Sequence, residues 1–306
     1  NTVRERLDEA IADAKERLTG QKTVRAKEES EKKKEAQKAA KSTAESQKAK
    51  STDDTDPARL KRKLPVLETT GASGTTDKSG TANSILKDEI GNLNQITGFV
   101  PDDSVAKSVT ITYRPESTVY VAERYGVFYE DDTWKDIEHS GKDDEEEMWE
   151  HMEDYLSCPT DLQKLTRYYI EEIGGIDGEW KDSKSEIEAI RKKICEALWE
   201  LAVYDTEPGA TPAGKDFVEY FLFENRKGFC VHFASAGTLL FRLAGKEARY
   251  AEGYAVPASA FEEQEDGTYQ AQISGAMGHA WCQVWCLDDG YWENVEVTPP
   301  AGIEQI

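Results

Sequence analysis

The sequence predicts an α+β protein in which a helical part precedes an antiparallel sheet. Apolar residues recur at helical spacing between residues 160 and 201 and again after Cys230. Beyond Gly245, segments that alternate apolar and polar side chains replace that spacing, as half-buried strands do. The expected organisation is a mostly disordered N-terminal region over 1–82, a small β-rich unit over 83–140, and a helix-and-sheet core over 141–306.

The N-terminal region carries several different patterns. Residues 2–19 place their apolar side chains on one stripe, which predicts an amphipathic helix. Residues 21–58 contain almost no large apolar group, so we expect a disordered or lone-helix linker. The basic run Arg59–Lys63 is interpreted as a solvated charge run, with contact to anionic lipid as the alternative. Residues 69–83, rich in Gly, Ser and Thr, predict a flexible linker.

The β-rich unit is expected to end near Trp134. Residues 109–113, 119–121 and 125–129 alternate apolar and polar side chains, with Pro, Asp and Gly between them. The acidic segment 141–150 lacks the alternating ligands and the glycine of a calcium loop. We therefore expect that segment to be a solvated bridge.

The core should contain two helices ahead of a Pro/Gly loop at 204–216. One helix begins at Thr160 or Asp161, and the other runs from Ser185, a plausible N-cap, to about Leu201. A third helix begins at the cysteine that follows the loop. The strands are expected at 248–256, 269–273, 280–287 and 291–297.

Charge excludes one large class of function. The chain of 306 residues has a formal net charge of −22, and residues 64–306 carry 20 Lys and Arg against 47 Asp and Glu. A body this acidic repels phosphate, so we expect no nucleic-acid partner.

No run of about 18 apolar residues, which a membrane-spanning helix needs, is present in the sequence. No signal peptide is visible. Because the chain begins at Asn1 without methionine and stops at Ile306 with no obvious end signal, we expect it to be a piece of a longer protein.

The five cysteines have no zinc-site spacing, so we expect neither a metal nor another cofactor. Cys282 and Cys286 lie four apart on an expected strand, about 13 Å apart along it, which is too far for a disulfide. We interpret both as small buried hydrophobic residues.

One cysteine has a different setting. The stretch GFCVHFASAG at 228–237 places Cys230 at the head of a helix, where the helix dipole favours thiolate over thiol. Downstream, GHAWCQVW carries His279 and YWENVEVTP carries Glu296. Cysteine, histidine and carboxylate are the components of a nucleophilic acyl-transfer site.

Strand geometry suggests how these residues meet. His279 and Trp281 share one face of their strand, where Trp281 would wall a substrate cleft. Glu296 on the next strand would accept the proton of the far imidazole nitrogen, and the Cys230 N–H would be one oxyanion donor. A second donor is not identified. His232 points about 200° away from Cys230 on the helix, so we interpret it as packing at the helix start.

Residues 204–300 resemble the transglutaminase-like superfamily in its bacterial membrane-associated branch. The resemblance rests on YDTEPGATPAGKDFVEYFLFENRKGFCVHFASAGTLLFRLAGKEARYAEGY, GHAWCQVW and YWENVEVTPP, which occur in that order. It implies a papain-like core with Cys230 as nucleophile, His279 as base and acid, and Glu296 as the orienting carboxylate. Many relatives have aspartate in the third place, and relatives usually carry Ile-Pro-Ala-Arg where this chain has Gly-Lys-Glu-Ala-Arg at 245–249.

The predicted function is thiol acyl transfer on peptide or protein amides, either transamidation or peptide hydrolysis. The resemblance implies an extracytoplasmic location in bacteria, with a cell-surface protein or peptide as partner and membrane attachment through segments outside this chain. The alternative is a catalytically silent module that binds peptide or cell-wall polymer. The oligomeric state is left open.

Overall fold

The computed structural model describes residues 66–68, 91–101, 103–139, 141–174 and 183–300. From Val66 onwards these residues belong to one compact unit. The N-terminal helix, the charged linker, the basic run and the Gly/Ser/Thr linker expected within 1–83 lie outside the described residues.

Along the described part of the chain, an early group of strands is followed by a run of helices, and most of the strands of the two large sheets come after α7 (Cys230–Leu243). In order they are β1 (Val66–Glu68), η2 (Leu93–Gln95), β2 (Val105–Ile111), β3 (Val119–Gly126), β4 (Phe128–Glu130), β5 (Thr133–Lys135), α2 (Asp144–Glu150), α3 (Met152–Leu156), α4 (Gln163–Tyr168), η3 (Tyr169–Ile173), α5 (Ser183–Leu201), β6 (Val203–Tyr204), α6 (Phe217–Tyr220), η4 (Phe221–Asn225), β7 (Lys227–Gly228), α7 (Cys230–Leu243), β8 (Ala248–Val256), η5 (Ala258–Ala260), β9 (Glu262–Glu263), β10 (Tyr269–Ser274), η6 (Gly275–Met277), β11 (Gly278–Cys286) and β12 (Tyr291–Val295).

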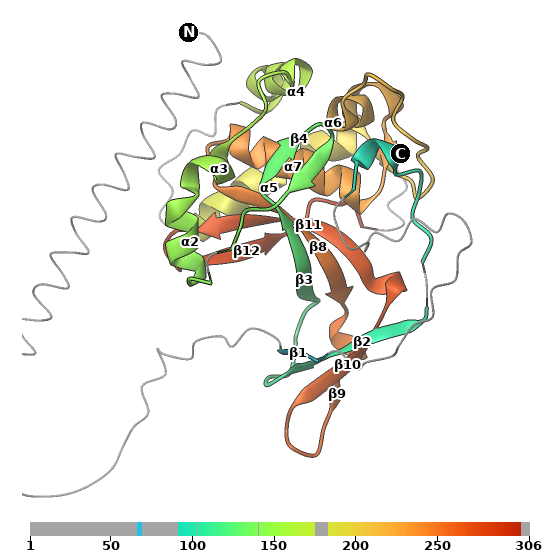
Figure 1. Cartoon of the computed structure of the whole chain (residues 1–306), viewed down its shortest axis with the longest axis vertical. Coiled ribbons are helices and arrows are strands. Elements are labelled where there is room, and N and C mark those ends of the chain that lie inside the picture. The colour runs from blue at the N-terminus through green and yellow to red at the C-terminus, as the bar shows by residue number, and fades with distance from the viewer. Residues whose placement is uncertain (1–65, 69–90, 102, 140, 175–182, 301–306) are drawn as a thin grey trace, which may run out of the picture. The chain divides into compact units, whose positions relative to one another are not determined.

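An antiparallel sheet with strand order β12-β11-β8-β3 forms the centre of the molecule. Helix α7 packs on this sheet, and α5 packs on α7 (Figure 1). Residues Cys230–Arg242 of α7 are all buried, so this helix is covered on every side rather than along one stripe. The predicted α+β class, with a cysteine-bearing helix on an antiparallel sheet, is confirmed.

A second antiparallel sheet, with strand order β1-β2-β10-β9, has its own small core. Val109, Ile111 and Ile273 from this sheet pack with Val121 and Tyr254 of the central sheet. The expected β-rich unit over 83–140 is therefore not separate, because β2 joins the second sheet while β3 pairs with β8. The boundary at residue 83 is also displaced, since β1 pairs with β2.

The acidic segment after residue 140 is a helix, not the expected solvated bridge. The Asp143 side chain accepts a 2.9 Å hydrogen bond from the backbone N–H of Glu146, which caps α2. Four acidic residues in the first turn lie at the positive end of the helix dipole, where they stabilise it. Met148 is buried in a cluster with Trp285 and Trp292, and this packing fixes the helix on the body.

The other core elements follow the sequence patterns closely. Helix α5 buries Ile187, Ile190, Ile194 and Leu198 on the expected stripe, although Ser185 lies inside the helix instead of capping it. Helix α4 begins after Leu162 without a side-chain cap, so neither Thr160 nor Asp161 has the expected capping role. Strands β8, β10, β11 and β12 each overlap an expected strand.

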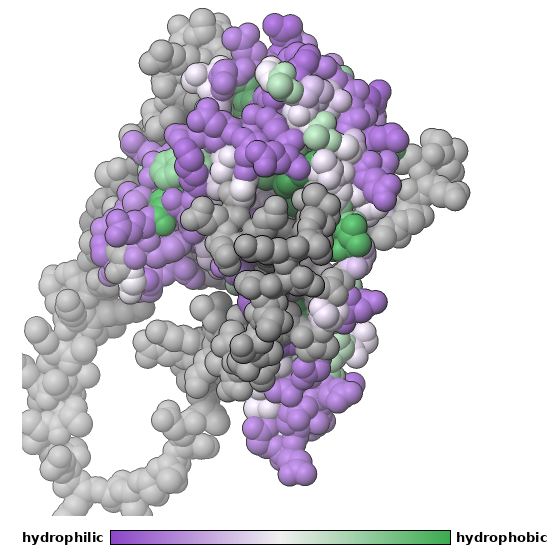
Figure 2. Space-filling view, turned by 45° about the vertical axis from the view of Figure 1, so that its right-hand side comes forward, coloured by the Kyte–Doolittle hydropathy of each residue, from purple (hydrophilic) through white to green (hydrophobic). Residues whose placement is uncertain are grey.

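Hydrophilic side chains predominate on the face of the molecule seen in Figure 2. Among the described residues, no helix is both long enough and apolar enough to cross a bilayer. In the described part of the chain the five cysteines form no disulfide, and Cys282 and Cys286 are fully buried, as expected.

Candidate active site

The start of α7 positions Cys230. Phe229, immediately before the helix, is extended, with φ −121° and ψ −171°, and its N–H donates to Nδ1 of His232 at 3.4 Å. The His232 ring packs against Phe217 and Phe229, and burial lowers its pKa to about 3. A neutral His232 that closes the first turn agrees with the packing role expected for it.

His279 and Glu296 meet at the ends of two neighbouring strands. Strand β11 pairs with β12 so that Cys282 lies opposite Val295, and Glu296 is the first residue after β12. His279 Nε2 lies 2.6 Å from Glu296 Oε2. The other carboxylate oxygen, Oε1, accepts a 2.7 Å hydrogen bond from the backbone N–H of Thr298.

The pKa of His279 shows that Cys230 also interacts with this imidazole. Burial alone would lower the pKa of His279, but hydrogen bonds to Cys230 and Glu296, together with their charges, raise it to about 10. Glu296 takes Nε2, which leaves Nδ1 as the ring nitrogen available to the thiol. Burial opposes ionisation of Glu296, yet its hydrogen bond to His279 and the imidazolium charge lower the pKa of this carboxyl. The structure thus gathers the three residues selected from the sequence.

Trp281 does not occupy the position expected for a substrate-binding residue. Its side chain is fully buried, and its Nε1 donates a 2.8 Å hydrogen bond to Asn294 Oδ1. The ring stacks on His279 with centroids 6.3 Å apart and an interplanar angle of 11°. Trp281 therefore packs against the imidazole ring and presents no surface to a substrate, which corrects the expected role.

Tyr120 is a component of the site that the sequence did not indicate. Its hydroxyl donates to Glu296 Oε2 at 3.1 Å, across 176 residues of sequence. Its ring lies 5.0 Å from that of Trp281. The period-two pattern identified the strand that carries Tyr120, but only the pairing of β3 with β8 shows that this strand reaches the site.

Helix α5 holds the backbone beside Glu296, which the sequence also did not indicate. Arg191 Nη1 donates to the Glu296 carbonyl at 3.4 Å, and Trp199 Nε1 donates to the Val297 carbonyl at 2.9 Å. Between them on the helix, the Cys195 thiol lies 3.8 Å from the Glu296 carbonyl. These residues are four apart, so they form one helical stripe that contacts the chain after β12.

Tyr204 lies at the surface of the site. Burial and the charges of Cys230 and Glu296 raise the pKa of its hydroxyl to about 12. The residue is nevertheless 38% exposed. This exposure makes it a wall of the site rather than a core residue.

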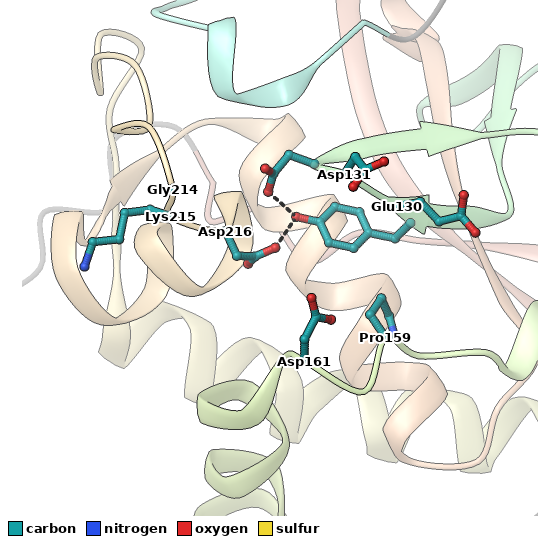
Figure 3. Close-up of a pocket in the computed structure, with 9 residues that line it drawn as sticks. Glu130, Asp131, Pro159, Asp161, Gly214, Lys215 and Asp216 are labelled. Carbon is teal, nitrogen blue, oxygen red and sulfur yellow. Dashed lines mark hydrogen bonds between the residues drawn. The ribbon is translucent and has the colours of Figure 1, made fainter.

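A hollow of about 490 Å³ lies elsewhere, among acidic side chains (Figure 3). There the Tyr129 hydroxyl donates to Asp216 at 2.8 Å, and burial raises the pKa of Asp216 to about 6. Asp216 also caps α6, and Asp132 accepts the backbone N–H of Phe217 at 2.7 Å. These carboxylates thus have structural partners. Across the described part of the chain, no group of three or more His, Cys, Asp or Glu side chains is arranged to hold a metal ion.

Comparison with known proteins places the site within a family. Residues 175–297 match the family model for the transglutaminase-like superfamily. This segment contains Cys230, His279 and Glu296. This part of the chain is therefore similar to the transglutaminase-like superfamily, as the motifs indicated.

Two curated bacterial proteins resemble the chain over about a third of its length. A protein-glutamine gamma-glutamyltransferase from Pseudomonas aeruginosa is 36% identical over 103 residues, which are 34% of this chain and 14% of that protein. The uncharacterized protein YebA from Bacillus subtilis is 33% identical over 99 residues, which are 31% of this chain and 13% of that protein. The matched segment thus spans only a small fraction of these relatives.

Among solved structures, the chain is similar to the periplasmic domain of TgpA from Pseudomonas aeruginosa bound to ethylmercury. The identity is 25%, the TM-score is 0.36, and the match covers 51% of this chain and 52% of that one.

Proposed function

We propose that this protein is a thiol acyl-transfer enzyme that acts on peptide or protein amides. In this proposal Cys230 is the nucleophile, His279 the base and acid, and Glu296 the carboxylate that orients the imidazole. The observation that carries it is the 2.6 Å contact between His279 and Glu296, on an imidazole whose pKa Cys230 and Glu296 together raise to about 10. Such an imidazolium remains charged at neutral pH and stabilises a thiolate beside it.

The proposed reaction begins when the Cys230 thiolate attacks the amide carbon and the carbonyl π electrons move onto oxygen. The Cys230 N–H, free of helical partners at the first position of α7, is directed at that oxyanion. The second donor that we propose is the hydroxyl of Tyr204, a partly exposed residue that pairs with Gly228, two positions before Cys230. As the tetrahedral species collapses, His279 protonates the departing nitrogen and a thioester forms.

The second half of the reaction decides the product. His279, now neutral, takes a proton from an amine or from water as that molecule attacks the thioester, and the Cys230 thiolate leaves. Attack by an amine gives transamidation, whereas attack by water gives hydrolysis. The name of the Pseudomonas relative, a gamma-glutamyltransferase, favours transamidation of glutamine as the first reaction to test.

Alkylation with iodoacetamide at pH 6 tests the proposed nucleophile. Cys230 should label much faster than the other cysteines, and Cys230→Ala should remove the fast phase. The remaining thiols are internal controls, because burial raises the pKa of Cys158 to about 12 and that of Cys195 to about 11, and also raises the pKa of Cys282. Equally slow labelling of all five cysteines would contradict the proposal.

A second assay separates the two reactions. A glutamine-containing peptide is incubated with the protein and a primary amine probe, and ammonia release and probe incorporation are both measured. Incorporation of the probe supports transamidation, while ammonia release or peptide cleavage without incorporation supports hydrolysis. Both activities should disappear in Cys230→Ala.

A catalytically silent binding module is the second candidate function. It is favoured by one observation, that Cys230 is only 2% exposed. This candidate predicts that a peptide or cell-wall polymer binds equally well to the wild type and to Cys230→Ala, with no turnover by either. Thioester trapping followed by mass spectrometry distinguishes the two candidates.

We also propose an extracytoplasmic location, with membrane attachment through segments outside this chain. Its support is the resemblance of the motifs to the bacterial membrane-associated branch. The test is protease accessibility of the full-length protein in bacterial cells whose outer layers are permeabilised and whose plasma membrane is intact. Complete protection of the protein in such cells would contradict this location.

A further inference from the structure

We propose that Tyr120 is a positioning residue, whose hydroxyl holds the Glu296 carboxylate in the orientation that accepts the His279 Nε2 proton. The inference rests on the proposed function and names an additional residue on which that site depends. Tyr120 lies outside the segment 175–297 that matches the family model.

Glutamate needs such a tether because its side chain has three torsions, and the last of them is broad. In the structure both carboxylate oxygens are held. Oε1 accepts from the Thr298 N–H at 2.7 Å, and Oε2 accepts from His279 at 2.6 Å and from Tyr120 at 3.1 Å. Without the Tyr120 hydroxyl, the carboxylate plane would be held by one backbone donor and by the imidazole that it is meant to orient.

Tyr120 is itself well fixed. On β3 it lies opposite Ala255 of β8, within the antiparallel pairing that ties β3 to the central sheet. Its ring contacts Trp281 at 5.0 Å and His279 at 6.2 Å between centroids. Burial and the Glu296 charge both raise the pKa of its hydroxyl, which therefore stays protonated and remains a donor.

The main alternative is that the Tyr120 hydroxyl weakens the contact between His279 and Glu296. A donor on Oε2 withdraws charge from the oxygen that His279 uses, so Tyr120 would then weaken the contact between His279 and Glu296 instead of supporting it. The two cases predict opposite signs. If positioning dominates, removal of the hydroxyl destabilises the imidazolium; if competition dominates, removal stabilises it.

Among the described residues, the charged and titratable groups around His279 and Glu296 come from several elements of the fold. Arg191 and Cys195 of α5 lie at the Glu296 carbonyl. Cys230 belongs to α7, Glu296 follows β12, Tyr120 belongs to β3, and Tyr204 of β6 lies close enough for the charges of Cys230 and Glu296 to act on it. A change in the pH dependence of Cys230 after a substitution at Tyr120 therefore reports on this group as a whole.

The test is Tyr120→Phe in the whole chain, with Tyr125→Phe as the matched control. Tyr125 is on the same strand, but its ring contacts Arg249 and His139 rather than the site. Two properties are measured as functions of pH: the rate of Cys230 alkylation, which requires no substrate, and kcat/KM. Thermal unfolding followed by circular dichroism verifies that both variants are folded.

We expect the acid limb of Cys230 alkylation to move up by about one pH unit in Tyr120→Phe, because a less stable imidazolium supports the thiolate less well. We expect kcat to fall about ten-fold with KM changed less than about two-fold, the loss typical of one hydrogen bond to a charged group. In a Glu296→Gln background, Tyr120→Phe should no longer move the acid limb, because the carboxylate through which it acts is gone.

Three outcomes would overturn the inference: an unchanged acid limb, a shift of that limb to lower pH, or an equal shift in Tyr125→Phe. If the wild type itself shows no fast-labelling Cys230, the proposed function fails first. The two failures are thereby distinguished.

Discussion

Hydrogen bonds converge on Glu296 from four different parts of the chain. Its carboxylate accepts from His279, Tyr120 and the Thr298 N–H, and its carbonyl accepts from Arg191. Glutamate is the longer of the two acidic side chains, so more contacts are needed to give it one orientation. The several hydrogen bonds to Glu296 restrict the additional torsion that its longer side chain has.

Replacing Glu296 by glutamine should lower kcat/KM by at least about 100-fold. The amide keeps the shape of the side chain but removes the negative charge that helps to raise the pKa of His279 to about 10. The alkaline limb of the pH–rate profile should therefore move to lower pH. Glu293→Gln is the control, since Glu293 accepts from the Tyr291 hydroxyl instead. Equal activity of both variants would contradict the role of Glu296.

A second histidine makes stability depend on pH. His139 lies 2.8 Å from Glu147 of α2 and 3.0 Å from Asp136, with the Tyr125 ring against it. Burial by itself lowers the pKa of His139, but the hydrogen bonds to the two carboxylates raise it above the ordinary histidine value of about 6.5. A raised pKa in the folded state means that this contribution is complete below about pH 6.5 and is lost as the pH rises through the folded-state value.

His139→Asn should therefore destabilise the protein more at pH 5.5 than at pH 9. The free energy of unfolding, measured with urea at both pH values for wild type and variant, checks this expectation. A difference that is larger at pH 9, or equal at both, would show that the two ion pairs of His139 contribute nothing.

At the scale of elements, a glycine of α7, Gly237, lets this helix approach the central sheet closely. At Gly237 an added Cβ would lie 2.8 Å from Val297 Cγ2 and 2.9 Å from Cys282 Sγ. Only glycine allows this approach, and Cys230 lies two turns earlier on the same helix.

Gly237→Ala should lower the free energy of unfolding by about 1–3 kcal/mol, although alanine favours helix more than glycine does. Gly91→Ala is the control, because an added Cβ there meets nothing within 4 Å. Urea unfolding of both variants measures the difference. A Gly237→Ala variant as stable as the wild type would show that the sheet and helix can separate slightly without cost.

At the scale of the whole molecule, β3 connects the two parts that the sequence separated. It is the edge strand of the central sheet, and it buries Val119 and Val121 against residues of the second sheet. A boundary near residue 140 therefore cuts through one continuous structure.

A fragment limited to 141–306 should fail to unfold cooperatively, because it lacks β3 and leaves the edge of β8 unpaired. A fragment of 65–306 retains every strand of both sheets and should show a single cooperative transition. Thermal unfolding followed by circular dichroism compares the two fragments. A cooperative transition in 141–306 would show that the domain boundary predicted near residue 140 is correct.

The predictable features were those that depend on local pattern. The spacing of apolar residues identified α5, α7, the strand that carries His279 and the strand that ends just before Glu296, because period 3.6 and period 2 are visible in a single segment. Helix α2 was missed because its first turn is acidic, and only its cap and the burial of Met148 explain the helix. Tyr120 was missed because no local pattern indicates which strand pairs with which.

By itself, the sequence determined the fold class, the helix that presents Cys230, and the candidate group of Cys230, His279 and Glu296, since each depends on residue type and spacing along one segment. The tertiary structure decided that Tyr120 and α5 reach Glu296, that Trp281 is buried beneath His279, and that β3 belongs to the central sheet. The physical reason is that strand pairing and helix docking join residues more than 100 positions apart. Those contacts depend on how buried surfaces fit together and leave no periodic trace in the chain.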